Sequence, residues 1–217
     1  MAEDSLALAL KEIKQNGKER KFLESIEMAV NLKDVDLADP KNRVNEEIIL
    51  PNGRGKDTKV AIIGSDELKS KAKGIADFVY GPEDLSKFAE DKKNFKKIAN
   101  QVDFFIAEST LMATVGKTLG QVLGPRGKIP KPVPPGQDPA SIVSNLRKTV
   151  RVRSRDRRTF HVLVGTKKMS DKEIRENILA IMKRLTGKLE KGTGNIESVY
   201  IKSTMGKAVR VNTGDLQ

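Results

Sequence analysis

The strongest constraint on the fold is a hydrophobic pattern that changes twice along the 217 residues. From Phe22 to Leu32 apolar side chains occupy even positions, which predicts a strand with one buried face. The segment 59–64 is instead a short, nearly continuous apolar run, typical of a strand buried on both faces in a parallel sheet. From Val150 onward the alternating style returns. The simplest organisation is therefore one domain inserted into another.

The middle segment alternates strands with helices. Besides 59–64, strands are expected at 78–80 and 103–107, and the helices are expected near 65–74, 82–100, 111–123 and 139–148. This alternation predicts right-handed crossovers and a parallel sheet. The glycine- and proline-rich stretch 124–136 is expected to break regular structure and form an extended, stiff loop.

The outer segments combine helices with alternating strands. Leu6, Leu10 and Ile13 fall on one helical face, and Gly17 is a plausible end of that helix. A capping box, Ser to Glu at three residues, begins a second helix at Ser170. Its expected buried stripe comprises Ile174, Ile178, Ile181 and Leu185, and the further strands are expected at 44–50, 150–154, 159–164, 199–202 and 207–211.

These patterns predict a two-domain protein that mixes α+β and α/β architecture. Residues 1–56 and 157–217 are expected to form a discontinuous α+β domain. Residues 57–156 are expected to form an inserted three-layer α/β domain of Rossmann-like type. The two crossings, near 51–56 and 151–158, are expected to act as a double hinge.

Charge points to the class of partner. Lys and Arg number 41 against 29 Asp and Glu, a net charge of +12 that favours a polyanion but does not separate RNA from DNA or an anionic membrane. No apolar run approaches the ~20 residues of a membrane span, and the acidic start lacks a secretory signal pattern. With no Cys and one His, a thiolate zinc site is excluded and most His-based metal sites are too. We expect a soluble cytoplasmic protein that binds no membrane, metal or cofactor.

Enzyme signatures are weak. Gly116-Lys-Thr118 is similar to the end of a phosphate-binding loop, but the glycine that this loop needs is Leu111, and Gly116 lies in a helical pattern. No GxGxxG occurs, and no catalytic constellation can be argued. The alternative function, a small α/β nucleotide-dependent or nucleic-acid-modifying enzyme, would need one of these. A DNA-binding regulator would need a helix-turn-helix signal, which is missing.

The final hairpin carries the most specific binding signal. A hydroxyl, a thioether and a residue without a side chain stand together at Thr204-Met205-Gly206, which suits backbone laid close to a ribose-phosphate surface. Glu27 is unusual on a phosphate-binding surface, but its carboxylate can accept a hydrogen bond from a ribose 2′-OH, which DNA lacks. The alternative is an ordinary exposed strand glutamate. Phe22 could stack on a base, although strand alternation favours core packing.

Basic residues gather in the second crossing. The stretch 147–158 holds seven Lys or Arg in twelve residues, which favours phosphate contact over a merely solvated hinge. His161 follows this stretch, and a half-exposed strand histidine and an RNA contact remain equally open for it. The lysines at 92, 93, 96 and 97 alternate with acidic and apolar residues and are interpreted mainly as a solvated helix face.

Four segments in order, 22–27, 50–56, 123–132 and 203–206, resemble one known family. It is the family of the first-numbered large-subunit ribosomal protein in its archaeal form, which forms the mobile stalk beside the tRNA exit site. The Gly-Pro-Arg-Gly-Lys-x-Pro-Lys-Pro and Thr-Met-Gly signatures carry most of the resemblance. The chain departs from the family at Lys207, where Pro is usual, and at Asn52, where His is common.

The resemblance implies a non-enzymatic ribosomal protein with one domain inserted in the other. Its partners would be the stalk rRNA of the large subunit, the deacylated tRNA whose release from the exit site it assists, and the leader of its own mRNA, whose translation it would repress. The stretch 124–136 would be the contact surface of the inserted domain. Carried over by position, the RNA-binding residues would be Phe22, Ser25, Glu27, His161, Lys167, Ser198, Thr204, Met205 and Gly206.

Overall fold

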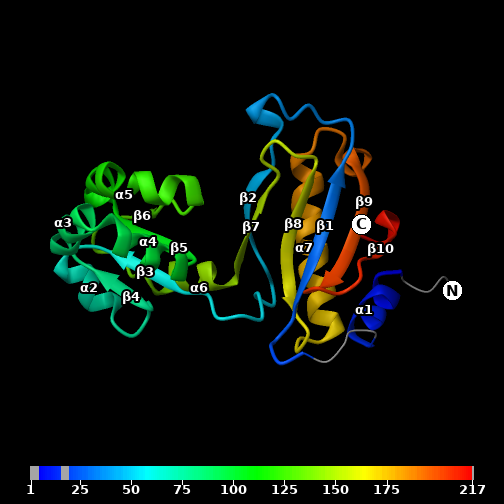
Figure 1. Ribbon diagram of the computed structural model, residues 1–217, viewed down its shortest axis with the longest axis horizontal. Coiled ribbons are helices and arrows are strands. Elements are labelled where there is room, and N and C mark those ends of the chain that lie inside the picture. The colour runs from blue at the N-terminus through cyan, green and yellow to red at the C-terminus, as the bar shows by residue number, and fades with distance from the viewer. Residues whose placement is uncertain (1–4, 16–19, 217) are drawn as a thin grey trace. The chain divides into compact units, whose positions relative to one another are not determined.

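The computed structural model describes residues 5–15 and 20–216. The chain forms two compact units (Figure 1). The outer unit comprises residues 1–56 and 148–217, and the inserted unit comprises residues 57–147. The second boundary lies at residue 148 rather than near 156, because strand β7, Thr149–Arg153, pairs along its length with β2, Asn45–Ile49, of the outer unit.

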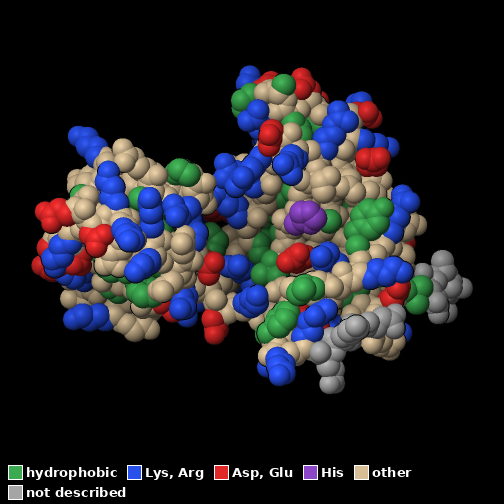
Figure 2. All heavy atoms as spheres, in the orientation of Figure 1, with side chains coloured by type: hydrophobic (Ala, Val, Ile, Leu, Met, Phe, Trp, Pro, Cys, Tyr) green, Lys and Arg blue, Asp and Glu red, His purple; other side chains and the backbone are tan. Residues whose placement is uncertain are grey.

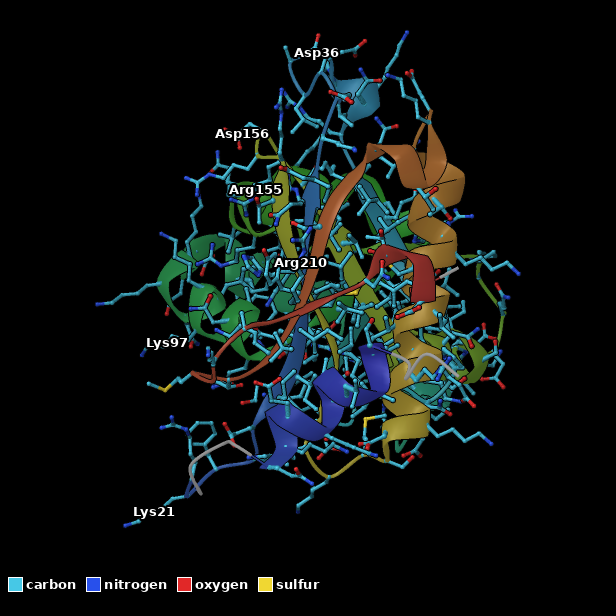
Figure 3. The ribbon with its side chains drawn as sticks, turned by 90° about the vertical axis from the view of Figure 1, so that its right-hand side faces the viewer. Lys21, Asp36, Lys97, Arg155, Asp156 and Arg210 are labelled. Atoms are coloured by element: carbon cyan, nitrogen blue, oxygen red, sulfur yellow. The ribbon has the colours of Figure 1, made fainter. Side chains whose placement is uncertain are left out.

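The outer unit is built on an antiparallel sheet with the strand order β10-β9-β1-β8. One face is covered by the helices α1 and α7 (Figure 3). Ile26, Met28 and Val30 of β1 are fully buried against the apolar stripes of these helices, whereas the intervening residues of β1 remain half-buried on the open face. The elements are α1 Ser5–Gln15, β1 Ser25–Leu32, β8 Thr159–Thr166, α7 Asp171–Lys188, β9 Ile196–Ser203 and β10 Val209–Val211, with short 3-10 turns η1 Pro40–Asn42, η3 Gly192–Asn195 and η4 Thr213–Leu216.

Both expected helices of the outer unit form. The stripe of α1 is buried as predicted, while Gly17, the expected helix end, lies outside the described residues. The capping box of α7 is confirmed: the Ser170 hydroxyl accepts the Glu173 N–H at 3.3 Å, and a Glu173 carboxylate oxygen accepts the Ser170 N–H at 2.8 Å.

The first crossing is anchored to the outer unit. The Asn52 N–H donates to Asn177 Oδ1 of α7 at 3.1 Å, and Asn177 Nδ2 donates to the Gly53 carbonyl at 2.9 Å. Gly55 adopts a positive φ of 67°, and a Cβ there would crowd Met169 at 2.6 Å, which explains the glycine. Residues 52–55 of the expected hinge are therefore packed segments of the outer unit.

The inserted unit has a parallel sheet with the strand order β4-β3-β5-β6, covered on both faces. Val60 and Ile62 of β3 belong to one apolar cluster, Ala61 and Ile63 to the other, and all four are fully buried. The three-layer α/β prediction is confirmed. The elements are β3 Val60–Ile63, α2 Asp66–Ala72, β4 Phe78–Tyr80, α3 Pro82–Glu90, α4 Lys92–Gln101, β5 Phe104–Glu108, η2 Ser109–Leu111, α5 Met112–Arg126, β6 Lys131–Val133 and α6 Ala140–Lys148.

The inserted unit differs from the prediction in two details. The stretch 82–100 is helical as predicted, but Asp91 divides it: Asp91 ends α3 and caps α4 by accepting the Asn94 N–H at 2.9 Å. The expected break at Gly124 does not occur, because α5 runs through Pro125 and ends where Gly127 takes a left-handed φ of 67°. The loop after it also contains β6, which pairs in parallel with β5.

Candidate nucleic-acid interface

The Thr204-Met205-Gly206 turn is clamped to the start of β1. The Thr204 N–H donates to the Ser25 carbonyl at 2.9 Å, and the Ser25 N–H donates to the Thr204 hydroxyl at 3.0 Å. The same hydroxyl lies 3.2 Å from the Ser25 carbonyl, to which it donates. The Thr204 hydroxyl therefore keeps one lone pair, with which it can accept a hydrogen bond but not donate one.

Ser25 acts through its backbone in this clamp. Its side chain is buried, so its hydroxyl has little room for a direct contact with RNA. Burial here follows from the register, in which Ser25 pairs with Thr166 of β8 while its carbonyl and N–H hold Thr204. Ser25 thus fixes the position of the turn.

Met205 and Gly206 form the apex of the turn. Met205 is 71% exposed, and its backbone takes a left-handed φ of 59°. The Gly206 N–H donates to the Ser203 carbonyl at 2.8 Å, and a Cβ on Gly206 would overlap the Ser203 hydroxyl. The turn can therefore close in this conformation only with a glycine at position 206, whatever binds to it. The sequence did not reveal this contact with Ser203.

Phe22 lies beside the clamp and is exposed. Half of its surface is accessible, so the core packing that strand alternation favours was wrong: β1 begins only at Ser25 and the alternation does not extend to Phe22. The ring lines a basic groove of about 730 Å³, whose other lining residues are Lys14, Gln15, Arg20, Lys21, Leu23, Glu24, Lys167 and Lys168. An exposed ring beside cations suits base stacking near phosphate.

A part-buried ion pair between Lys167 and Glu24 lines this groove. Lys167 Nζ donates to Glu24 Oε2 at 2.7 Å, the Lys167 N–H donates to the Glu24 carbonyl at 3.0 Å, and Arg20 Nε lies 3.6 Å from Glu24 Oε1. The hydrogen bond from Lys167 holds the pKa of Glu24 below its usual value, against the effect of burial, and a hydrogen bond from Ser203 adds to it. Lys167 therefore serves the site by joining β8 to the strand entry at Glu24, and Ser203 extends that link to the turn.

Glu27 stands on the open face of β1, two residues from the clamp. Lys202 of β9 is its direct cross-strand neighbour and places a cation beside the carboxylate. On the other side, the pairing of β1 with β8 skips Val164, because Ile26 pairs with Gly165 and Glu27 with Leu163. Such a bulge re-aims the neighbouring side chains of a sheet.

Asn177 of α7 supports this bulge. It is fully buried, and its Nδ2 donates to the Val164 carbonyl at 2.8 Å, in addition to the bonds that hold Asn52 and Gly53. Sequence reasoning missed Asn177. The available signal was a polar residue within the apolar stripe of a helix, which demands a buried partner.

His161 and Ser198 lie farther along the same sheet. His161 of β8 is exposed, and Figure 2 shows the chain's one histidine on this face with both acidic and basic side chains near it. Ser198 of β9 is buried, and its hydroxyl accepts a hydrogen bond from Asn31 Nδ2 at 2.8 Å. The structure thus brings seven candidates to one end of the sheet, with His161 and Ser198 one and two rows farther along the strands: the seven are Phe22, Ser25, Glu27, Lys167, Thr204, Met205 and Gly206.

The basic turn between β7 and β8 borders the open face. Arg155, Arg157 and Arg158 are exposed, and Arg155 and Asp156 extend from the tip of this turn (Figure 3). The Leu32 N–H donates to the Arg158 carbonyl at 2.9 Å, which fixes the turn to the far end of β1. Phosphate contacts here would add affinity without sequence preference.

Other kinds of site find little support in the described residues. The Gly116–Thr118 segment lies inside α5, with the Thr118 hydroxyl donating to the Thr114 carbonyl at 2.8 Å, and so forms no phosphate loop. Within residues 5–15 and 20–216, no cluster of three or more His, Asp or Glu side chains is arranged to hold a metal. None of the described helices has the length and apolar character needed to cross a membrane.

The chain is similar to one family of known proteins over nearly its whole length. The model of the family described as "Ribosomal protein L1p/L10e family" matches residues 10–207. The "Large ribosomal subunit protein uL1" of Thermoplasma acidophilum is 65% identical over 95% of this chain and 95% of its own length. The proteins of the same description from Picrophilus torridus and Methanocella arvoryzae are 63% and 49% identical, over 95% and 97% of this chain and 97% and 100% of their own lengths.

Proposed function

The chain belongs to the ribosomal protein L1p/L10e family, and from that premise we propose that its outer unit binds the stalk rRNA of the large subunit. At the coarser level, it is a structural constituent of the large ribosomal subunit, located in the cytoplasm as part of the ribosome, and not an enzyme. We further propose that it assists release of deacylated tRNA from the exit site and represses translation by binding the leader of its own mRNA.

The observation that carries the rRNA proposal is the clamped turn beside Glu27. The turn presents an exposed thioether at Met205 and one free hydroxyl lone pair at Thr204. Two residues from the clamp, the Glu27 carboxylate stands on the open face. Both oxygen groups act as acceptors, and a ribose 2′-OH is a donor that a phosphate oxygen is not. The site therefore favours sugar edges of RNA over DNA.

Charge and stacking complete the proposed mechanism. Phe22 would stack on a base at the edge of the basic groove, and Met205 would pack on a sugar or base face. The arginines of the β7–β8 turn would contact phosphates and supply salt-sensitive affinity. Because the clamp, the ion pair at Glu24 and the bulge are held by internal hydrogen bonds, little of the site needs to be ordered on binding.

The proposals for tRNA and for the inserted unit rest on the segment 124–136. After α5 ends, Ile129 is 67% exposed between Gly127 and β6. Lys131 begins β6 at the edge of the parallel sheet. An exposed apolar side chain next to a cation suits the unpaired bases and phosphates of a tRNA.

The test is a binding titration of wild type and Glu27→Gln against a stalk rRNA fragment, the mRNA leader, deacylated tRNA and an unrelated duplex. A purely electrostatic surface would bind RNA slightly better after loss of a negative charge. We expect instead that the variant binds the stalk fragment about 5- to 30-fold more weakly, since a charge-assisted hydrogen bond worth ~1–2 kcal/mol is lost. The salt dependence should stay unchanged.

The matched control is Glu12→Gln, which removes the same charge from an exposed position of α1, on the covered side of the sheet. It should bind the stalk fragment as wild type does. Equal affinity of Glu27→Gln and Glu12→Gln would refute the role of Glu27. Wild-type binding no tighter to the stalk fragment than to the duplex would refute the proposed function.

A further inference from the structure

One row of side chains crosses the open face of the outer sheet beyond the clamped turn. Arg210 of β10 is paired with Tyr200 of β9, Tyr200 with Ala29 of β1, and Ala29 with His161 of β8. Directly paired residues project from the same face, and Glu27 and Ala29 share the face that the helices leave open. With strands ~4.8 Å apart, the row is about 14 Å long.

The row consists of three planar side chains and one small residue, Ala29, between two of them. Tyr200 and His161 carry rings, Arg210 carries a planar guanidinium, and Ala29 between the rings rises little above the backbone. His161 and Arg210 are exposed, while Tyr200 and Ala29 are half-buried. Planar rings and guanidinium groups are the surfaces on which unpaired bases stack.

Tyr200 is not used as a core residue. The ring–ring contacts found among the described residues all lie in the inserted unit. In β9 the core positions are Val199 and Ile201, which are fully buried, so the alternation directs Tyr200 to the opposite face. A large aromatic ring on an open sheet face is available to a ligand.

The next row along the sheet bounds this surface. Asn31 Nδ2 donates to the Ser198 hydroxyl at 2.8 Å, and the Thr159 hydroxyl donates to Asn31 Oδ1 at 2.7 Å. These groups bond to one another and form a fixed polar border about 7 Å from the ring row. On the other side, Glu27 and Lys202 lead to the clamped turn. The ring row therefore continues the proposed RNA surface rather than forming an isolated patch.

We propose that this row is a stacking platform for one unpaired nucleobase of the bound RNA. The base lies over Ala29 against the ring of Tyr200, with His161 on its other side and Arg210 on a neighbouring phosphate. The paired bases of a duplex stay inside their stack and cannot enter the space between Tyr200 and His161, so the platform selects a bulged or looped nucleotide. The proposal rests on the proposed rRNA function and adds a second contact surface to it.

Intrinsic fluorescence gives a direct test, because the chain has two tyrosines and no tryptophan. A Tyr80→Phe background, which keeps an aromatic ring in the inserted unit, leaves Tyr200 as the sole tyrosine. Titration with the stalk rRNA fragment should quench Tyr200 emission in step with binding measured by filter retention. Binding without quenching would overturn the platform while leaving the proposed function intact. A fragment that does not bind at all would overturn the proposed function and, with it, the platform.

Substitutions separate stacking from structure. Tyr200→Phe keeps the ring and should retain affinity for the stalk fragment. Tyr200→Leu keeps apolar bulk but removes the stacking face, and should weaken binding about tenfold or more. Circular dichroism should be unchanged in both variants, and binding to an unrelated duplex should be unchanged too. Equal affinity of the Leu and Phe variants for the stalk fragment would refute the proposal.

Discussion

The two main sheets of the molecule differ in what they leave exposed. The parallel sheet of the inserted unit is covered by apolar clusters on both faces, whereas the antiparallel sheet of the outer unit is covered on one. A sheet enclosed on both faces can bind ligands only through its loops and strand ends. An open face can present whole rows of side chains. All nine candidate RNA-binding residues belong to the outer unit, as the open sheet would require.

The largest expected difference between the sheets is their response to a polar substitution. Ile62→Asn places an amide in the fully buried centre of β3 and should cost about 3–5 kcal/mol, enough to unfold the inserted unit. Hydrogen exchange should lose protection in residues 57–147 only. Because the proposed rRNA site lies in the outer unit, affinity for the stalk fragment should persist.

The matched substitution on the open face is Ala29→Asn in β1. Its side chain can remain in water, so the cost should stay below ~1 kcal/mol. Comparable destabilisation by the two substitutions would show that the outer sheet is not open. Loss of stalk binding in Ile62→Asn would show that the units do not act separately.

The next largest effect should come from the buried amide that supports the open sheet. Asn177→Leu leaves the Gly53 and Val164 carbonyls without their bonds from Nδ2, and should destabilise the outer unit by about 2–3 kcal/mol. Urea denaturation monitored by circular dichroism measures this. Ile178→Leu, a volume-conserving change at the neighbouring buried position, should cost less than ~1.5 kcal/mol. If the two variants have the same urea midpoint of unfolding, Asn177 is not a structural support.

The sequence predicted that one sheet is covered on one face and the other on both. It did not predict where the helices of the inserted unit end. Alternation in β1 and a continuous apolar run in β3 predicted the two kinds of sheet, because burial of one or two faces directly selects side chains. The helix end at Gly127 and the separation of α3 from α4 depend on which of several glycines and caps the packed helices use. Periodicity does not contain that choice.

The candidate site shows the same limit. The motif residues predicted the turn and Glu27, but the roles of Glu24 and Asn177 depend on strands and helices that are distant in sequence. Phe22 continued the even-numbered apolar pattern of β1 and was therefore favoured as core, whereas the strand begins three residues later. Contacts between segments decide such roles, and one sequence does not specify those contacts.

A smaller effect should localise binding to the turn of the open sheet. Gly206→Ala places a Cβ where it would overlap the Ser203 hydroxyl, so the turn must shift while the strands remain paired. We expect at least tenfold weaker stalk binding, or ~1.4 kcal/mol, with unchanged circular dichroism. The control Gly187→Ala, where a Cβ meets nothing within 4 Å, should retain affinity and slightly stabilise α7. Equal affinities of the two variants would exclude the turn from the interface.

The smallest expected effect is a pH dependence that distinguishes the two units through one buried carboxylate in each. In the outer unit, the hydrogen bond from Lys167 lowers the pKa of Glu24. In the inserted unit, the Ser65 N–H donates to Glu108 Oε2 at 2.8 Å and lowers the pKa of Glu108. A depressed folded-state pKa stabilises the protein above the unfolded value, near 4.5, and that stabilisation is lost as the pH falls through the folded value.

Glu24→Gln and Glu108→Gln each mimic one protonated carboxyl, so each variant should be less stable than wild type at pH 7 and approach it as the pH falls well below 4.5. Only Glu24→Gln should also weaken stalk binding at pH 7, because only Glu24 holds Lys167 beside the turn. Urea midpoints at several pH values and one binding titration measure both effects. A stability deficit that stays constant down to pH 3 would refute the charged role of these carboxylates. Weaker stalk binding by Glu108→Gln would show that the enclosed sheet also contributes to recognition.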